Sequence, residues 1–486
     1  MRGAGAMMRM GFARVAAFLF LLLAITSLLQ GQTSWYVSPS GLSTNAGTIG
    51  SPRDLASALA ASTTPAQPGD TIWLRGGTYS GLFTSTLAGT IANPIKVRQY
   101  PGERATLQGT ANSSYVLRVG GAYTWFMEFE IRDVSTNRLS SQSGSFPTDI
   151  TLDEGLTTIQ TTGSGVGCRA IHLVVHDTRQ GITPWMDAIG FEAYGNVVYH
   201  NGWNAPDRGH GHGFYSQNTS GTKRFANNLI FSGFSHGIQI YGTTVASLNN
   251  YLIEENTIVN SGDLMGGADA ERNLLLGGGN ISNGSTIRNN VLIYKTPLDG
   301  QVANFGYSPF GAGMSNSAVT GNRIYGGRLF INNELNTPGF TFTGNTLWTT
   351  LADFPQATYP SNTYLSAQPT GIEIIVRPSE YLSRRAHVTV LNWNLASTVA
   401  VSLASAGYVA GDAYRVVDAM NIYGPALVTG TYNGTSVTIP MTGLTMVAPT
   451  NTATLATHPA PLYGVFVVTG DAAVPHAPPA NVGVRP

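Results

Sequence analysis

Short apolar runs that begin with asparagine recur along the middle of the chain and limit the folds open to it. Each run has an Asn followed by three or four mostly apolar residues, at 196–199, 228–231, 256–259, 290–293, 322–325 and 345–348. Asn tolerates left-handed backbone and hydrogen-bonds its own turn, and Asn side chains stacked from coil to coil satisfy one another. A β-sandwich also has many short strands, but it does not need an asparagine at each corner. The pattern therefore predicts a solenoid of short, stacked strands.

The stretch from 187 to 242 contains three similar triplets, each a glycine followed by an apolar and then a polar residue. The triplets occupy 190–192, 213–215 and 237–239, so they lie 23 and 24 residues apart, which is about one solenoid coil. Alternate side chains of a strand point to opposite faces. Placing the triplets in register predicts that Glu192, Tyr215 and Gln239 point outward side by side.

Further polar and aromatic residues extend this outward row. Tyr194, Gln217 and Tyr241 lie two residues after Glu192, Tyr215 and Gln239, so along a strand they point to the same outer face. Neighbouring coils lie about 4.8 Å apart, so these side chains would form one polar, aromatic wall that suits a sugar chain. We expect these three residues and Gln239 to bind substrate.

Histidines are concentrated in the same coils. Six of the nine lie between 172 and 236, and His212 and His236 each immediately precede a triplet. Asp207 and His210 lie in the loop that leads into the wall, and we expect both to contact substrate. The alternative is a polar ladder that only satisfies backbone groups at the corners. The concentration favours a functional site on the middle coils.

The two ends of the chain differ in composition from the middle. Residues 1–31 read as a signal peptide, because Arg2, Arg9 and Arg14 are followed by an apolar run at 15–29, and no later segment is apolar enough to cross a bilayer. We therefore expect a secreted protein, extracellular or periplasmic, without a membrane partner after cleavage. Residues 471–486 are rich in Pro and Ala and predict a disordered tail.

Between these ends we expect an all-β protein of two domains. Residues 32–352 carry the repeats, and a short helix within 54–61 would cap the first coil. A linker is expected at 353–370. Residues 371–470 show strand runs at the spacing of a β-sandwich, which we interpret as an accessory domain.

Composition excludes some classes of function. Charged residues are only 11% and the net charge is zero, which argues against nucleic acid as a partner because no basic excess exists to neutralise phosphates. The single cysteine, Cys168, excludes an intrachain disulfide. We expect a monomer. The polar segment 133–166 predicts a long loop, which either borders a binding cleft or is a mobile decoration.

Several N-terminal motifs resemble those of a known superfamily. They lie at 36–41, 69–79, 89–96 and 100–103. They look like the entry to right-handed parallel β-helix (pectin-lyase-like) proteins, and within them like the chondroitinase B and alginate lyase group. The resemblance implies the fold, and lyase activity that in that group relies on a Lys/Arg pair, often with Ca²⁺. The basic pair near the wall is Lys223-Arg224. Residues 210–213 also look like the His-containing site of β-helix alginate C5-epimerases.

β-Elimination of a uronic-acid-containing polysaccharide is the first functional hypothesis. This reaction needs a cation for the carboxylate, a base for the C5 proton and an acid for the leaving oxygen. Arg208 can hold the carboxylate through its planar fork. His212 or His236 can be the base, and Tyr215 or Tyr241 the acid.

Three alternatives remain open. Hydrolysis needs two carboxyl groups on one face, which Glu192 with Asp187 or Asp207 could supply. The imidazoles of His210, His212 and His236 could bind a metal. The glycines at 211 and 213 leave open whether His210 and His212 share a face, so the metal is unknown and no cofactor is certain. A non-catalytic glycan-binding surface protein could use the same wall.

Overall fold

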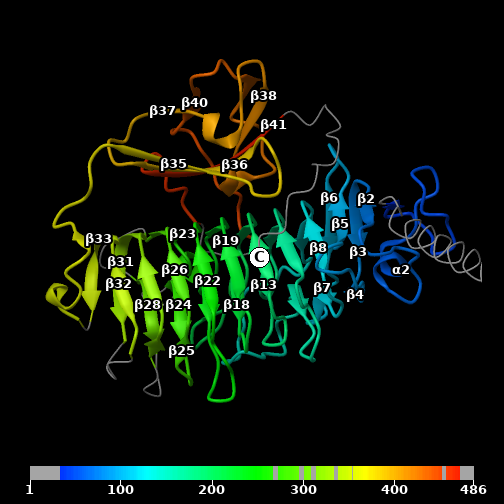
Figure 1. Ribbon diagram of the computed structural model, residues 1–486, viewed down its shortest axis with the longest axis horizontal. Coiled ribbons are helices and arrows are strands. Elements are labelled where there is room, and N and C mark those ends of the chain that lie inside the picture. The colour runs from blue at the N-terminus through cyan, green and yellow to red at the C-terminus, as the bar shows by residue number, and fades with distance from the viewer. Residues whose placement is uncertain are drawn as a thin grey trace, which may run out of the picture.

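The computed structural model describes residues 33–265, 272–294, 300–307, 313–332, 338–352, 354–450 and 456–470. The expected signal peptide and tail lie outside these ranges. Parallel coils stack along one axis, and a C-terminal unit lies along one side of the stack (Figure 1). In the described ranges, no helix is long and apolar enough to span a membrane.

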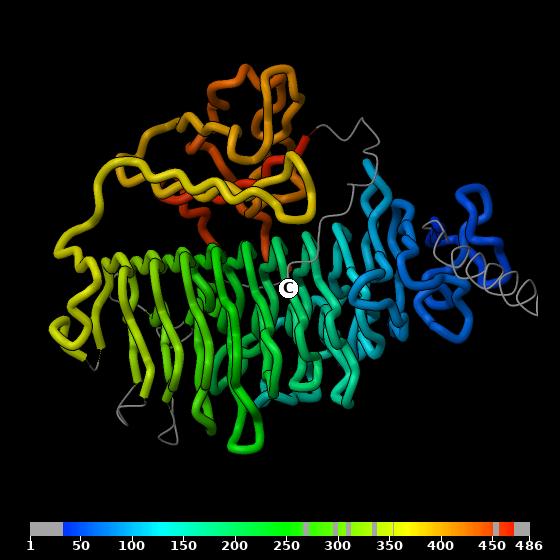
Figure 2. Tube along the Cα trace, viewed as in Figure 1, coloured from blue at the N-terminus to red at the C-terminus, as the bar shows by residue number. Residues whose placement is uncertain are grey.

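Three parallel ladders form the sides of the solenoid, here called the first, second and third faces. The first face is an 11-stranded sheet made of β1 (Ser34–Val37), β2 (Thr71–Leu74), β5 (Ile95–Gln99), β8 (Thr124–Met127), β11 (Arg169–Ile171), β14 (Glu192–Tyr194), β19 (Lys223–Ala226), β22 (Tyr251–Glu254), β26 (Thr286–Arg288), β30 (Ala318–Thr320) and β32 (Thr341–Thr343). The tube in Figure 2 follows each coil through the three faces in turn.

The other two faces share a 19-stranded sheet. The second face comprises β3 (Gly77–Ser80), β6 (Ala105–Gln108), β9 (Glu130–Arg132), β12 (Val174–His176), β15 (Val197–Tyr199), β20 (Leu229–Phe231), β23 (Thr257–Val259), β27 (Val291–Ile293), β31 (Arg323–Ile331), β33 (Thr346–Ala352) and β34 (Thr363–Tyr364). The third face comprises β4 (Phe83–Ser85), β7 (Tyr115–Val119), β10 (Glu154–Thr158), β13 (Ile182–Thr183), β18 (Phe214–Ser216), β21 (Ile238–Ile240), β24 (Arg272–Gly277) and β28 (Gln301–Tyr307). The long strands β31 and β33 pair in both faces, which joins them into one sheet.

Stacked asparagines hold one corner of the solenoid, as the sequence predicts. Each amide nitrogen donates to the side-chain oxygen of the next asparagine at 2.8–2.9 Å. The ladder contains Asn196, Asn228, Asn256, Asn290, Asn322, Asn345 and Asn362. Buried amides need such partners, so the ladder satisfies a polar row inside an apolar core.

The N-terminal end of the core is covered by a short helix. Helix α2 (Leu55–Leu59) begins after Asp54, whose side chain accepts a hydrogen bond from the Ser57 N–H at 2.8 Å. Leu55, Ala58 and Leu59 are buried against the first coils. The helix is shorter than the range 54–61 expected from sequence, but it covers the same core.

The C-terminal unit is antiparallel. Its five-stranded sheet contains β35 (Ile372–Pro378), β36 (Arg385–Asn392), β41 (Tyr463–Gly470), β38 (Ala413–Asp418) and β39 (Val428–Thr431), and a second pair contains β37 (Thr398–Val401) and β40 (Val437–Pro440). It packs on the outside of the second face, where Phe231 and Ile293 meet Trp393 and Val465. The solenoid itself continues to β34, inside the range expected as a linker.

Short elements complete the described chain. They are the hairpin of β16 (Trp203–Asn204) and β17 (Gly209–His210), the pair β25 (Ser282–Asn283) and β29 (Met314–Ser315), and the 3-10 turns η1 (Asp263–Met265), η2 (Gln356–Thr358), η3 (Ala404–Ala406) and η4 (Ala419–Asn421). The β16–β17 hairpin projects where the chain passes from the second to the third face. It therefore lies beside the third face.

Candidate functional site

A column of glycines fixes the third face. The N–H groups of Gly155, Gly181, Gly213 and Gly237 each donate to a carbonyl of the next coil at 2.8–3.0 Å. A Cβ at Gly181 would lie 2.4 Å from the Gly213 carbonyl oxygen, and one at Gly213 would lie 2.6 Å from that of Gly237. The coils therefore approach too closely here for any side chain, which is one reason for glycine within a strand.

The residues that precede these glycines form a polar column on the same face. The backbone hydrogen bonds place Glu154, Gln180, His212 and His236 in successive coils, and Arg272 in the coil after them. The imidazoles of His212 and His236 are stacked, with ring centroids 5.1 Å apart and an interplanar angle of 11°. The predicted histidine column is confirmed.

Tyr215 lies next to this column. It pairs in register with Gln239 of the following coil, as predicted, and Phe214 beside it points into the core. Its ring contacts His212 at 5.6 Å and Trp185 at 5.4 Å between centroids. Tyr215 is half-buried in a frame of aromatic rings.

Burial sets the protonation of both groups. Burial, followed by the nearby His236, lowers the pKa of His212 well below the usual value for histidine, so its imidazole is neutral at pH 7. Its Nδ1 is buried without a hydrogen-bond partner among the described residues, and the Gln239 side chain hydrogen-bonds the ring. Burial raises the pKa of Tyr215, so its phenol keeps its proton.

The hairpin brings a cation to the edge of this pair. Arg208 is exposed, donates to the Gly209 carbonyl at 3.1 Å and to the Ser145 hydroxyl at 3.4 Å, and forms no ion pair with any described residue. It lies within electrostatic reach of both His212 and Tyr215. Arg208, His212 and Tyr215 are therefore together, as the sequence predicts.

The remaining residues expected at the wall lie on either side of it. His210 Nε2 lies 3.1 Å from an Asp207 carboxylate oxygen. The Gln217 amide donates to the Tyr241 carbonyl at 3.3 Å, and the Tyr241 ring lies 6.2 Å from that of Tyr307. Asp207 and His210 thus border the third face through the hairpin, and Gln217 and Tyr241 border it where the strands end.

The predicted position of Glu192 is wrong. Glu192 lies in β14 on the first face and pairs with Arg224, 32 residues later, rather than with Tyr215. It is 7% exposed, and its carboxylate accepts hydrogen bonds from Arg224 at 2.7 Å and Tyr381 at 2.8 Å. Tyr194 of the same strand is buried beneath Tyr381. Neither residue belongs to the wall.

The physical reason lies in the first triplet. Gly190 has a φ of +68°, so it is a turn glycine, whereas Gly213 and Gly237 are glycines of close contact between coils. Hydrolysis by Glu192 with Asp187 or Asp207 is therefore not supported, because Glu192 lies on a different face of the solenoid from the wall.

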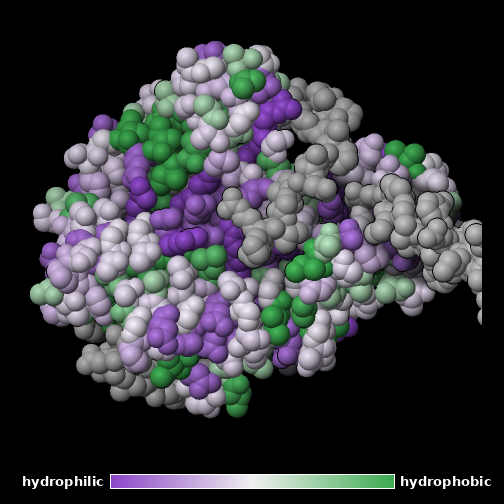
Figure 3. Space-filling model, viewed as in Figure 1, coloured by the Kyte–Doolittle hydropathy of each residue, from purple (hydrophilic) through white to green (hydrophobic). Residues whose placement is uncertain are grey.

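The basic pair Lys223-Arg224 does not lie on the wall either. Lys223 is fully buried and donates to the carbonyl oxygens of Pro184, Trp185 and Gln217 at 3.1, 2.8 and 2.6 Å. Arg224 binds carboxylates on the first face. In Figure 3 hydrophilic residues gather where the C-terminal unit meets the coils.

Sequence reasoning missed Glu154, Arg179 and Trp185 as members of the third face. Glu154 begins β10, one position before a column glycine, and burial raises its pKa. The signal was a pattern that the four coils share, a polar residue, then glycine, then an aliphatic or aromatic residue. It occurs at 154–156, 180–182, 212–214 and 236–238.

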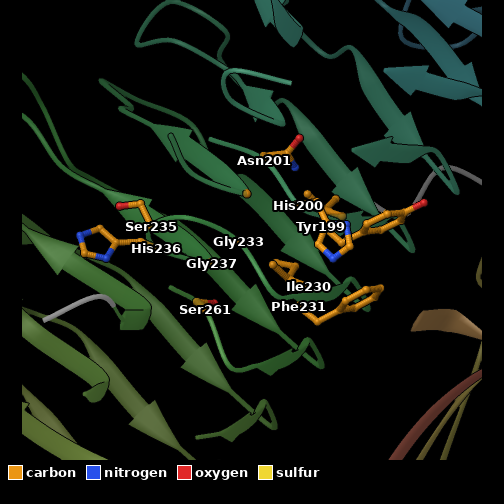
Figure 4. A pocket seen from close by; sticks show the side chains of 12 residues that line it. Tyr199, His200, Asn201, Ile230, Phe231, Gly233, Ser235, His236, Gly237 and Ser261 are labelled. Atoms are coloured by element: carbon orange, nitrogen blue, oxygen red, sulfur yellow. The ribbon is translucent and has the colours of Figure 1, made fainter. Parts of the chain in front are cut away.

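A small cavity lies behind this face. It measures about 10 Å³ and is lined by His200, Asn201, Ser235 and Ser261, among others, which is room for one water molecule. In Figure 4 the His236 imidazole points away from Tyr199 and Phe231. The cavity is too small for a sugar, so the open outer surface of the third face is the candidate site.

The donor set does not fit a metal ion within the described ranges, where no group of three or more His, Cys, Asp or Glu side chains converges. Neither Ca²⁺ nor the three-histidine site therefore has a basis in these residues.

Comparison with known proteins agrees with this architecture. Residues 35–172 match the family described as Pel9A-like, right-handed β-helix region. The chain is a right-handed parallel β-helix protein. Comparison with curated proteins finds no match.

Solved structures similar to this β-helix protein include three carbohydrate-active enzymes. Pectate lyase Pel9A is 16% identical with a TM-score of 0.45, over 69% of this chain and 80% of its own. An alginate lyase from Paenibacillus sp. is 15% identical with a TM-score of 0.36, over 68% and 97%. The lacto-N-biosidase from Eubacterium ramulus is 13% identical with a TM-score of 0.35, over 72% and 70%. At these identities the likeness concerns the fold.

Proposed function

We propose that this β-helix protein is a carbohydrate-active enzyme that cleaves a uronic-acid-containing polysaccharide by β-elimination on its third face. The observation that carries the proposal is the convergence of an exposed arginine, a neutral histidine and a protonated tyrosine, namely Arg208, His212 and Tyr215. These are the three groups that the reaction needs. The match to a Pel9A-like region supports it, because the Pel9A of known structure is a pectate lyase.

Each residue has one role in this mechanism. Arg208 binds the carboxylate of the uronate and stabilises the charge that develops as C5 loses its proton. His212 takes the C5 proton on its neutral imidazole, and the electrons of the C5–H bond form the C4–C5 double bond. The C4–O bond breaks, and Tyr215 gives its proton to the leaving oxygen. No step uses a metal.

The same reasoning extends to the setting of the enzyme. A polysaccharide does not cross a membrane readily, so its degradation is consistent with the proposed export through residues 1–31 and a location outside the cytoplasm. We propose that the mature chain acts as a monomer.

Unsaturated products test the reaction directly. On a panel of polygalacturonate, alginate and neutral glycans, the wild type should raise the ultraviolet absorbance of a C4–C5 unsaturated uronate with an acidic polymer only. His212→Ala and Tyr215→Phe should lower turnover by about 100-fold or more, as expected for a lost proton-transfer group, while the thermal midpoint stays nearly unchanged. Arg288→Ala on the first face is the matched control and should keep full activity.

Other outcomes identify the rivals. New reducing ends without absorbance indicate hydrolysis, for which the raised pKa of Glu154 on the same column supplies a general acid. Binding to an acidic glycan without any cleavage indicates a non-catalytic binding protein. Wild-type rates in both variants remove His212 and Tyr215 from the site.

A further inference from the structure

An exposed aromatic ring stands beside the catalytic trio on a loop to which the mechanism gives no role. Phe146 is 88% exposed. Its loop, residues 138–149, lies against the β16–β17 hairpin, where Ser140 N donates to the Asn204 carbonyl at 2.8 Å and Gly144 N donates to the Asp207 carboxylate at 3.2 Å. Residues 138–149 of the segment predicted as a long loop therefore lie beside the hairpin, whereas residues 154–158 of that segment form strand β10.

The ring is held in place by a stack rather than by burial. The Arg179 guanidinium carbon lies 5.5 Å from the Phe146 ring centroid and 5.2 Å from that of Trp203. Trp203 in turn stacks on His210, with centroids 5.1 Å apart and an interplanar angle of 9°. Arg179 also donates to the Ser145 carbonyl at 2.8 Å. A single exposed apolar residue is ordinary, but an exposed ring fixed by a stack of three further groups predicts a contact surface.

Charge indicates what this ring contacts. The residue before Phe146 is Ser145, whose hydroxyl accepts the hydrogen bond from Arg208. Arg208 forms no ion pair with a described residue, whereas the carboxylate of Asp207 next to it is bound by His210. The surface thus combines an apolar ring with an available cation, which complements the C–H face and carboxylate groups of an acidic glycan.

We propose that Phe146 forms an additional sugar-binding subsite, in which its ring stacks on the sugar next to the uronate held by Arg208. This proposal rests on the proposed function and deepens it, because it predicts a preference for chains long enough to reach the 138–149 loop. Pre-organised aromatic side chains bind at low entropic cost, so the subsite lowers KM for long substrates and leaves the chemical step unchanged.

Chain length tests the subsite. With polygalacturonate or alginate as substrate, whichever the wild type cleaves, Phe146→Ala should raise KM about tenfold, the factor expected from the lost burial of one ring, without changing kcat. The shortest oligosaccharide that is cleaved should show no change. Phe146→Trp should restore the wild-type KM. Val409→Ala, an exposed apolar residue of the C-terminal unit at 66% exposure, is the matched control.

Binding without turnover separates this proposal from the previous one. Affinity electrophoresis in gels containing the same acidic polymer, with His212→Ala as the common background, should show weaker retardation when Phe146→Ala is added. Retardation that falls while the wild type produces no cleavage overturns the lyase proposal and keeps the subsite. Equal KM for long substrates and equal retardation overturn the subsite, whatever the activity.

Discussion

The first and third faces of the solenoid use arginine in opposite ways. On the first face Arg224 binds Glu192, Glu254 and Glu380, and Arg288 also binds Glu254. On the third face Arg118, Arg179 and Arg208 form no ion pair with a described carboxylate. Arg118 and Arg179 lie over aromatic rings, and Arg208 stands exposed at the edge.

The net charge of zero is therefore the sum over surfaces whose local charges differ. The first face is neutralised internally and covered around Tyr381 by the C-terminal unit. The third face keeps the positive charge of Arg208 available beside the neutral imidazole of His212. A surface of this kind favours an anionic polymer, which is consistent with the proposed site on the third face.

Removing one arginine from each face gives the largest expected contrast. Arg208→Ala should lower kcat/KM on the acidic substrate by about 100-fold or more, because a charge-assisted contact to the reacting uronate is lost. Arg288→Ala, whose side chain is 50% exposed on the first face, should leave kcat/KM unchanged. Steady-state kinetics measure both. Equal losses in the two variants would mean that the faces do not differ in function.

Glycine substitutions compare the two faces by their effect on the free energy of unfolding. Gly213→Ala should lower the free energy of unfolding by about 3 kcal/mol, because its Cβ meets the carbonyl of the next coil. Gly190→Ala should cost only about 1 kcal/mol, the strain of a left-handed residue, since no atom lies closer than 4.0 Å to its Cβ. Urea denaturation measures both, and a larger loss at Gly190 would contradict the assignment of the two glycine types.

Acidification tests the buried imidazoles of the two structural units. Burial lowers the pKa of His200 and of His387 to about 3 in the folded protein, while the unfolded chain takes up these protons near pH 6.5. Stability is therefore fully present above pH 6.5 and falls below it, by about 1.4 kcal/mol per pH unit for each histidine. Urea midpoints at pH 7, 6 and 5 measure the slope.

The same pH series has an internal control. His387→Asn should reduce the slope between pH 6.5 and 5, because one buried imidazole no longer resists protonation. An unchanged slope would show that His387 is protonated in the folded state. His176 is the opposite case, since its two carboxylate partners outweigh burial and raise its pKa.

The solenoid was predictable because its signal is local and repeated. The second-face strands from β15 onward each follow an asparagine, and each of these coils places the same amide at the same corner. His212, Tyr215 and Gln239 were likewise predictable, because the similar triplets 213–215 and 237–239 lie in register in adjacent coils. Local pattern was sufficient where the same triplet occupied the same face of neighbouring coils.

Glu192 was misplaced because coil length varies. The hairpin at 203–210 lengthens the coil, so the first-face partner of Glu192 lies 32 residues later, and a triplet of residues carries no mark of which face it occupies. Its burial by Tyr381, 189 residues away, depends on the docking of the C-terminal unit. A short sequence motif does not indicate contacts between residues so far apart in the chain.

The glycine column has an evolutionary consequence. Each of these glycines contacts the backbone of the following coil, so a side chain introduced at one glycine would first displace the neighbouring coil. Residues on this surface can therefore be exchanged only where the adjoining layers permit, and specificity for a different polymer would be acquired by changing the side chains beside the glycines while the glycines themselves stay.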